Sequence, residues 1–354
     1  MTSIFDAGTL GDIRISNRVV MAPMTRSRAA PGGLPDDLHV TYYGQRASAG
    51  LIITEGTQPS EAGQGYCRTP GIHSPEQITA WRRVTEAVHA RGGAIVLQIM
   101  HVGRIASALN KAPGAETVAP SAIRAQGQMF TESGMVDFDL PRALETAEIP
   151  GVIEEFAQAA RNAREAGFDG VELHCTSGYL PAQFLSTGTN QRNDGYGGSV
   201  TNRVRFVLET LEAMASAVGA GRVGFRICPG NPFNDLHDAD PRETFGTLLQ
   251  AASPLGLAYL HLIDLRDKVI DSAGLARQFW TGPKILNESL DLELAQGLLA
   301  AGEADAVSFG RHYIANPDLV ERFRTGAKLA KFDRTTLYTA GAAGYIDYPA
   351  MSQR

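Results

Sequence analysis

The feature that most constrains the fold is an alternation, repeated eight times, of a short apolar run with a longer amphipathic segment. Because the short runs are apolar on both faces and rich in β-branched residues, they suit parallel strands covered by helices. The expected strands are residues 19–21, 51–54, 94–100, 170–174, 223–227, 259–263, 284–286 and 306–309. The expected helices are residues 37–49, 75–91, 150–166, 201–218, 241–252, 273–280, 291–301 and 317–324.

Eight strands alternating with eight helices in 354 residues predict a closed (β/α)8 barrel, or TIM barrel, which needs roughly 250 residues as one unit. An open, doubly wound parallel sheet is the alternative that the same alternation allows. The remaining residues would form a short N-terminal cap and an extended loop after the third strand, residues 105–148, which is rich in Gly, Pro and Ser. We therefore expect residues 1–354 to form a single domain.

Composition excludes several classes of partner and site. The net charge is −6 and no Lys/Arg cluster occurs, so we expect no nucleic acid and no membrane as a partner. No apolar stretch approaches the ~20 residues that span a bilayer, and no secretory signal is visible. Cys67, Cys175 and Cys228 are far apart and the eight histidines show no ligand spacing, so we expect neither disulfides nor a metal. A cytoplasmic monomer or homodimer is the expectation that remains.

Polar residues gather at the C-terminal ends of the expected strands, where function sits in an α/β barrel. Thr25 follows the first strand, and Gln98 lies near the end of the third. His174 closes the fourth strand and Arg226 lies near the end of the fifth. Because polar groups converge at one end of an otherwise apolar structure, the pattern predicts a binding site for a small molecule.

The last two strands end in loops that predict a phosphate site. Gly310 and Arg311 follow the eighth strand, and residues 287–291 follow the seventh. In a barrel these loops frequently bind phosphate through backbone N–H groups and a cation. Glu288 would repel an anion if it pointed inward, which weakens the prediction for the earlier loop. The alternative is that Gly310 only makes a turn and Arg311 pairs with a carboxylate.

Several motifs occur in a fixed order along the chain. They are NRVVMAPMTR at 17–26, YYGQRASAGLIITE at 42–55, HSPEQ at 73–77, ELH at 172–174, NDGYGGS at 193–199, FGR at 309–311 and GYIDYP at 344–349. With these motifs the chain resembles, from end to end, the old yellow enzyme family of FMN-dependent NAD(P)H ene-reductases. The resemblance implies an eightfold barrel, which the alternation predicts independently.

The resemblance implies roles for the polar strand ends around tightly bound, non-covalent FMN. Thr25 matches the residue that bonds the flavin C4 carbonyl, and Gln98 matches the glutamine facing the pyrimidine edge. Arg226 matches the arginine beside flavin N1 and O2, where a guanidinium stabilises the reduced anion. Gly310 and Arg311 match the phosphate site. The resemblance also places Pro23, Met24, Gly56 and His174 against the cofactor.

The resemblance further implies a two-step reaction in which NAD(P)H reduces the flavin and an electron-poor alkene then takes hydride from flavin N5. His174 matches the histidine that holds the activating oxygen of the substrate, and Tyr179 matches the donor of the proton to the α-carbon. Ser177 departs from the family, which has His or Asn at that position. Because a serine hydroxyl is shorter, we expect weaker activation of simple cyclic enones and more room for bulkier or nitro-bearing substrates.

Aromatic and apolar positions match the walls of the family's substrate pocket. They are Tyr66, Met100, Phe233 and Tyr338. Met100 stands where many relatives have Trp, so we expect a softer wall at that point. Expected substrates are enones, maleimides and nitroalkenes.

Other functions remain open from the residues alone. A flavin-dependent reductase of nitro groups, nitrate esters or quinones needs no placed proton donor. A flavin-binding barrel with weak turnover would follow if Ser177 leaves the oxygen clamp too weak. A metal-free lyase would need a lysine at the C-terminal end of a strand to form a Schiff base, whereas Lys284 lies at the start of its strand. A Cys175 nucleophile is disfavoured because successive side chains of a strand point to opposite faces, away from His174.

Overall fold

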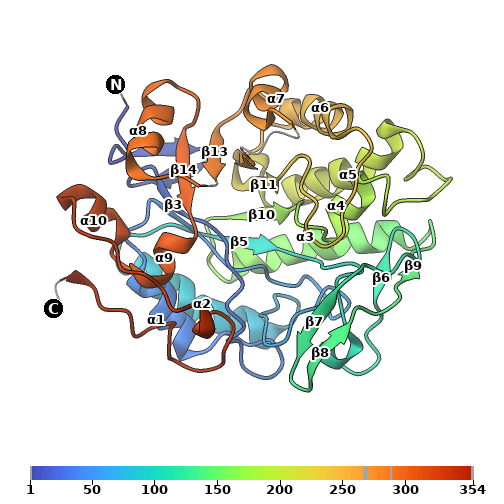
Figure 1. Ribbon diagram of the computed structural model, residues 1–354, viewed down its shortest axis with the longest axis horizontal. Helices are drawn as coiled ribbons and strands as arrows, with labels where there is room; N and C mark the ends of the chain where they lie inside the picture. The colour runs from blue at the N-terminus through green and yellow to red at the C-terminus, as the bar shows by residue number, and fades with distance from the viewer. Residues whose placement is uncertain (1, 266–269, 288, 352–354) are drawn as a thin grey trace.

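Eight parallel strands close into a barrel in the computed structural model, which describes residues 2–265, 270–287 and 289–351 (Figure 1). The barrel strands are β3 (Val19–Met21), β4 (Leu51–Ile53), β5 (Ile95–Ile99), β10 (Gly170–His174), β11 (Val223–Ile227), β12 (Tyr259–Ile263), β13 (Lys284–Asn287) and β14 (Ala306–Phe309). They pair in this order, and β14 pairs with β3 to close the ring. The predicted (β/α)8 barrel is therefore confirmed, and the open sheet is excluded.

Helices follow the strands and cover the outside of the barrel. They are α1 (Asp37–Gln45), α2 (Pro75–His89), α3 (Ile149–Glu165), α4 (Leu180–Leu185), α5 (Val200–Val218), α6 (Pro241–Ala252), α7 (Ser272–Phe279), α8 (Leu292–Ala300), α9 (Arg311–Ala315) and α10 (Leu319–Thr325). The short helices α4 and α9 were not expected, because each lies inside a loop that follows a strand.

The first helix is shorter than the predicted range of 37–49. It ends at Gln45, and the chain then turns so that the Gly50 N–H donates to the Val19 carbonyl oxygen at 2.9 Å. A Cβ at Gly50 would lie 1.8 Å from the backbone oxygen of Asn17, so only glycine allows this approach. A helix continued to residue 49 would prevent the pairing of β4 with β3.

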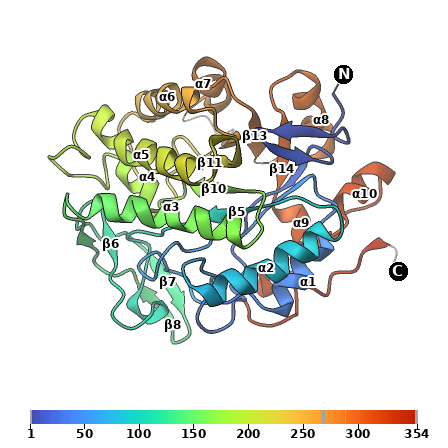
Figure 2. The same ribbon diagram turned by 180° about the vertical axis from the view of Figure 1, so that it is seen from behind.

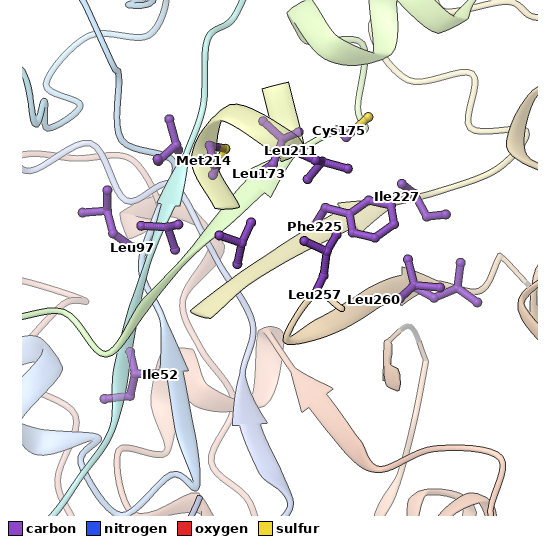
Figure 3. Packing of buried hydrophobic residues seen from close by; sticks show 14 of the residues in the cluster. Ile52, Leu97, Leu173, Cys175, Leu211, Met214, Phe225, Ile227, Leu257 and Leu260 are labelled. Atoms are coloured by element: carbon purple, nitrogen blue, oxygen red, sulfur yellow. The ribbon is translucent and has the colours of Figure 1, made fainter. Parts of the chain in front are cut away.

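Two apolar clusters hold the barrel together. The larger one fills the space between strands and helices, where Leu173, Phe225 and Leu260 face outward toward residues such as Leu211 (Figure 3). The smaller cluster fills the interior of the barrel beside the N-terminal hairpin. There the antiparallel hairpin of β1 (Gly8–Leu10) and β2 (Ile13–Ile15) packs against inward-facing strand residues. Figure 2 shows this hairpin as two dark blue arrows near α8. This hairpin is the expected N-terminal cap.

The expected long loop after β5 has structure of its own at the C-terminal end of the barrel. It contains the parallel pair β6 (Val118–Ala119) and β9 (Arg142–Ala143), and the hairpin of β7 (Gln128–Thr131) and β8 (Gly134–Asp137). Figure 1 shows these strands as a separate group beside the barrel. Met129 and Phe138 share a buried apolar cluster with Met100 and Tyr179, so the loop builds one wall of the barrel mouth.

The C-terminal segment returns across α1 and closes another side of the mouth. Tyr345 stacks on Tyr42 with ring centroids 4.0 Å apart, and Arg26 donates to the Gly344 carbonyl oxygen at 2.7 Å. Arg28 donates to the carbonyl oxygens of Thr336 and Ala343 at 2.7 and 2.9 Å. These contacts explain why the motifs at 17–26 and 42–55 accompany the ending at 344–349.

Candidate active site

A cavity of about 1040 Å³ opens at the C-terminal ends of the barrel strands. Seven of the predicted site residues line it. They are Pro23, Met24, Thr25, Arg226, Gly310, Arg311 and Tyr338. Residues from strand ends far apart in the sequence therefore share one cavity lining, whereas the predicted residues Gln98, His174, Ser177 and Tyr179 are not part of that lining.

The part of the cavity beside α9 is basic. Arg311 is the first residue of α9, and Gly310 lies next to Met24, whose sulfur would be 3.5 Å from a Cβ added there. Lys331 and Arg334 reach the same cavity from the segment after α10. Neither residue is predicted from strand ends, because both follow α10 and not a strand. Together these cations fit an anionic group such as a phosphate.

The loop after β13 contributes Ser289 to the cavity lining. Asp291, which also lines it, accepts the Leu294 N–H at 2.9 Å and so caps α8. Glu288, which we expected to disfavour an anion, lies outside the described residues.

Arg226 connects the cavity with the strands beside it. It pairs in register with His174 on β10 and with His261 on β12. Its guanidinium donates to Asn287 Oδ1 at 2.8 Å, and Asn287 Nδ2 donates to the Ser308 carbonyl oxygen at 3.0 Å. The cation on the cavity lining is therefore held by hydrogen bonds that cross several strands.

His174 is buried at the end of β10, and its Nδ1 makes no hydrogen bond to any described residue. Burial, with Arg226 and His261 adding to it, lowers the pKa of His174 well below its usual value. The imidazole is therefore neutral at physiological pH and keeps one N–H to donate. A buried ring nitrogen without a protein partner indicates a group that bonds a ligand.

Tyr179 stands directly against His174. Their rings meet edge to face, with centroids 4.8 Å apart. The Tyr179 hydroxyl donates to the Tyr66 hydroxyl at 3.0 Å. Burial raises the pKa of Tyr179 well above its usual value, so the phenol keeps its proton until a strong base, such as a developing carbanion, takes it.

The loop between His174 and Tyr179 has an unusual backbone. Ser177 has a φ of 57° and Gly178 a φ of 78°, both in the left-handed region. Asn234 Nδ2 donates to the Ser177 carbonyl oxygen at 2.8 Å, which holds this turn. In the described part of the chain, the hydrogen bond that Ser177 makes to the Asn234 side chain uses its backbone carbonyl and not its hydroxyl. Cys175 is buried in the outer cluster, as its strand position predicts (Figure 3).

The predicted residues Met100, Gly56, Phe233 and Tyr338 have different surroundings. Met100 is buried beside Tyr66 and Tyr179, and a Cβ at Gly56 would lie 2.5 Å from the Met100 sulfur. Gly56 therefore makes room for Met100 and does not line the main cavity. Phe233 and Tyr338 are exposed over 58% and 59% of their surfaces. Tyr338 reaches the cavity, whereas Phe233 lies outside its lining.

The described residues support neither a metal site nor a membrane-spanning helix. Within residues 2–265, 270–287 and 289–351, no group of three His, Cys, Asp or Glu side chains is placed to hold a metal ion. The helices described over the same ranges include none with the length and apolarity that a bilayer crossing demands.

Comparison with known proteins identifies the family. Residues 3–330 match the model of the NADH:flavin oxidoreductase / NADH oxidase family. The chain is 42% identical over 349 residues to a probable flavin mononucleotide-dependent alkene reductase of Leishmania infantum, covering 97% of this chain and 96% of the relative. It is 41% identical over 354 residues to 12-oxophytodienoate reductase 1 of Oryza sativa subsp. japonica, covering 97% and 92%.

Solved structures agree with this assignment. Morphinone reductase in complex with tetrahydroNAD superimposes with a TM-score of 0.95 at 45% identity, covering 99% of this chain and 98% of that one. The old yellow enzyme homologue from Zymomonas mobilis has a TM-score of 0.95 at 39% identity, covering 98% and 99%. The chain therefore belongs to the NADH:flavin oxidoreductase / NADH oxidase family and is an oxidoreductase of the old yellow enzyme type.

Proposed function

We propose that the chain is an FMN-dependent NAD(P)H ene-reductase that reduces the C=C bond of electron-poor alkenes such as enones, maleimides and nitroalkenes. The observation that carries the proposal is the pair of His174 and Tyr179. A neutral, buried imidazole with an unbonded Nδ1 lies in ring contact with a buried phenol that keeps its proton. An oxygen clamp beside a proton donor is what alkene reduction requires.

The residues present fit FMN. Lys331, Arg334 and Arg311 would hold the phosphate in the basic part of the cavity. Thr25, on the same lining, has a hydroxyl that can donate to a flavin carbonyl oxygen. Arg226 would lie at the pyrimidine edge, where its charge favours the reduced, anionic ring. The matched relative that is named a flavin mononucleotide-dependent alkene reductase supports this choice of cofactor.

When bound and reduced by NAD(P)H, FMN supplies the hydride that reaches the β-carbon of the alkene. His174 donates a hydrogen bond to the activating oxygen, which takes up the negative charge that develops as the C=C bond is attacked. Ser177 offers a second, shorter donor to the same oxygen. Tyr179 then gives its proton to the α-carbon, and solvent reprotonates the phenolate. The relative in complex with tetrahydroNAD supports the choice of nicotinamide as reductant.

The test is anaerobic stopped-flow spectroscopy of the purified yellow holoprotein. NADPH or NADH should bleach the flavin band, and 2-cyclohexenone or N-methylmaleimide should restore it with formation of the saturated product. His174→Ala should slow the second step by about 10²–10³-fold, the usual effect of losing an oxyanion donor, and leave the bleaching unchanged. If nitroaromatics or quinones restore the band and no alkene does, the proposed function is wrong.

A further inference from the structure

A continuous chain of hydrogen bonds runs through the barrel interior to the cavity lining, which includes Ser308, Asn287 and Arg226. Gln98 Nε2 donates to Glu172 Oε1 at 2.8 Å, and Glu172 Oε2 lies 2.9 Å from His261 Nδ1. His261 Nε2 lies 2.8 Å from Ser308 Oγ. Through its backbone carbonyl Ser308 also binds Asn287, which binds Arg226. The chain thus joins Gln98 and Arg226, the two groups expected at the flavin's pyrimidine edge, across six barrel strands.

Glu172 and His261 are completely buried, in strands whose neighbouring residues are apolar. A buried carboxylate is costly unless every oxygen is bonded, so its position is tightly constrained. Burial lowers the pKa of His261 more than Glu172 raises it, which leaves the imidazole neutral. A neutral His261 can satisfy both neighbours only by donating from Nδ1 to Glu172 and accepting at Nε2 from Ser308.

Glu172 therefore accepts hydrogen bonds through both oxygens, one from His261 and one from Gln98. The amide nitrogen of Gln98 is directed to Glu172, and no described residue donates to the carbonyl oxygen of that amide. An amide held in this way presents its oxygen, an acceptor, on the other side. The imide N–H of a flavin is a donor, so the held orientation matches that edge and the flipped orientation would not.

We infer that Glu172 is a positioning residue for the cofactor: it orients the Gln98 amide toward the flavin imide and, through His261, Ser308 and Asn287, ties that orientation to Arg226. The inference rests on the proposed placement of FMN. It predicts that the carboxylate of Glu172 sets both the affinity for FMN and its reduction potential, although it need not touch the ring.

The test compares Glu172→Gln with Gln98→Ala, with the double swap Glu172→Gln/Gln98→Glu, and with Ile285→Val as a control. Ile285 is fully buried in the same interior but lies outside the hydrogen-bonded chain. The readouts are FMN release from diluted holoprotein, followed by flavin fluorescence, and the reduction potential of bound FMN. Neither depends on turnover.

Glu172→Gln should raise the Kd for FMN about tenfold, because its new amide lets Gln98 flip and lose a matched hydrogen bond. The potential should become more positive, because a buried negative charge is lost. The double swap should bring the Kd back to within about threefold of the parent, since the carboxylate at 98 again offers an acceptor. Ile285→Val should lower the thermal midpoint modestly and leave both flavin readouts unchanged.

Three results would count against the inference. If Glu172→Gln lowers stability but leaves Kd and potential at the parent values, Glu172 is only a structural core residue. If Gln98→Ala leaves both readouts unchanged, the placement of FMN against Gln98 is wrong, and the proposed site fails with it. If Glu172→Gln does not fold, Ser308→Ala decides, because it removes only the hydroxyl that His261 accepts from. An unchanged potential in Ser308→Ala would then count against the inference.

Discussion

The hydroxyl of Tyr179 donates a hydrogen bond to the hydroxyl of Tyr66 at 3.0 Å. We expected Tyr66 only as an aromatic wall of the substrate pocket, and the structure adds a polar contact with the proposed proton donor. The two rings are nearly perpendicular, with an interplanar angle of 88°. Tyr66 therefore holds the phenol of Tyr179 in a defined orientation before substrate arrives.

This pair offers a matched test of the proton donor. Tyr179→Phe should slow alkene reduction by about 10²–10⁴-fold, the usual contribution of a general acid, while NAD(P)H still bleaches the flavin at the parent rate. Reduction of a nitroaromatic, which needs no proton at carbon, should hardly change. Tyr66→Phe removes a hydroxyl from the same hydrogen bond but keeps the donor, so its rate should stay within about tenfold of the parent. Equal losses in both variants would show that the hydrogen bond matters and the Tyr179 proton does not.

We expect Ser177 to be a weak second donor to the substrate oxygen. Ser177→Asn should increase the rate of 2-cyclohexenone reduction by about tenfold or more, because the longer amide can donate beside His174. Asparagine also tolerates the left-handed φ of 57° at this position. Ser177→Ala is the control and should lower the rate only slightly if the hydroxyl is too short to reach. The measurement is the rate of reoxidation of reduced enzyme, and no gain in Ser177→Asn would contradict the prediction.

His101 should make stability depend on pH. Burial lowers its pKa from 6.5 to about 3 in the folded chain. Below pH 6.5 the His101 side chain takes up a proton in the unfolded chain but not in the folded chain. The free energy of unfolding is therefore not reduced by His101 above that pH, and it falls as the pH decreases toward 3. At about pH 5 this one group should cost about 2 kcal/mol of unfolding free energy.

The matched variant is His101→Asn. The Gly103 N–H donates to His101 Nδ1 at 3.1 Å, and an asparagine oxygen can accept it in place of the ring. Urea unfolding at about pH 7 and pH 5, with saturating FMN, should show a smaller loss for the variant than for the parent. An identical loss in both proteins would exclude His101 as the cause.

Two glycines should respond in opposite directions to alanine. Gly50→Ala places a Cβ 1.8 Å from the Asn17 oxygen and should destabilise the chain by about 3 kcal/mol. Gly297 lies on the exposed face of α8 with nothing within 4 Å of an added Cβ, so Gly297→Ala should stabilise by about 0.5–1 kcal/mol. Thermal midpoints should move down and up accordingly. A stable Gly50→Ala would refute the close approach at the β3–β4 turn.

Much of the candidate site could be predicted because parallel strands bring their C-terminal ends to one side of the barrel. Thr25, Arg226 and Arg311 were placed by strand position alone, and each lines the same cavity. Lys331 and Arg334 could not be predicted in this way. They reach the cavity from a C-terminal segment whose course depends on the packing of Tyr345 against Tyr42.

The sequence by itself determined the eight strands and the barrel. The reason is that the alternation of apolar runs with amphipathic helices can be read from residues close together in the chain. Tertiary structure alone decided which polar side chains meet inside it. Glu172 and His261 lie 89 positions apart, and nothing in either strand indicates the other. Their contact depends on the register of strands around a closed ring, which long-range packing sets and no local pattern encodes.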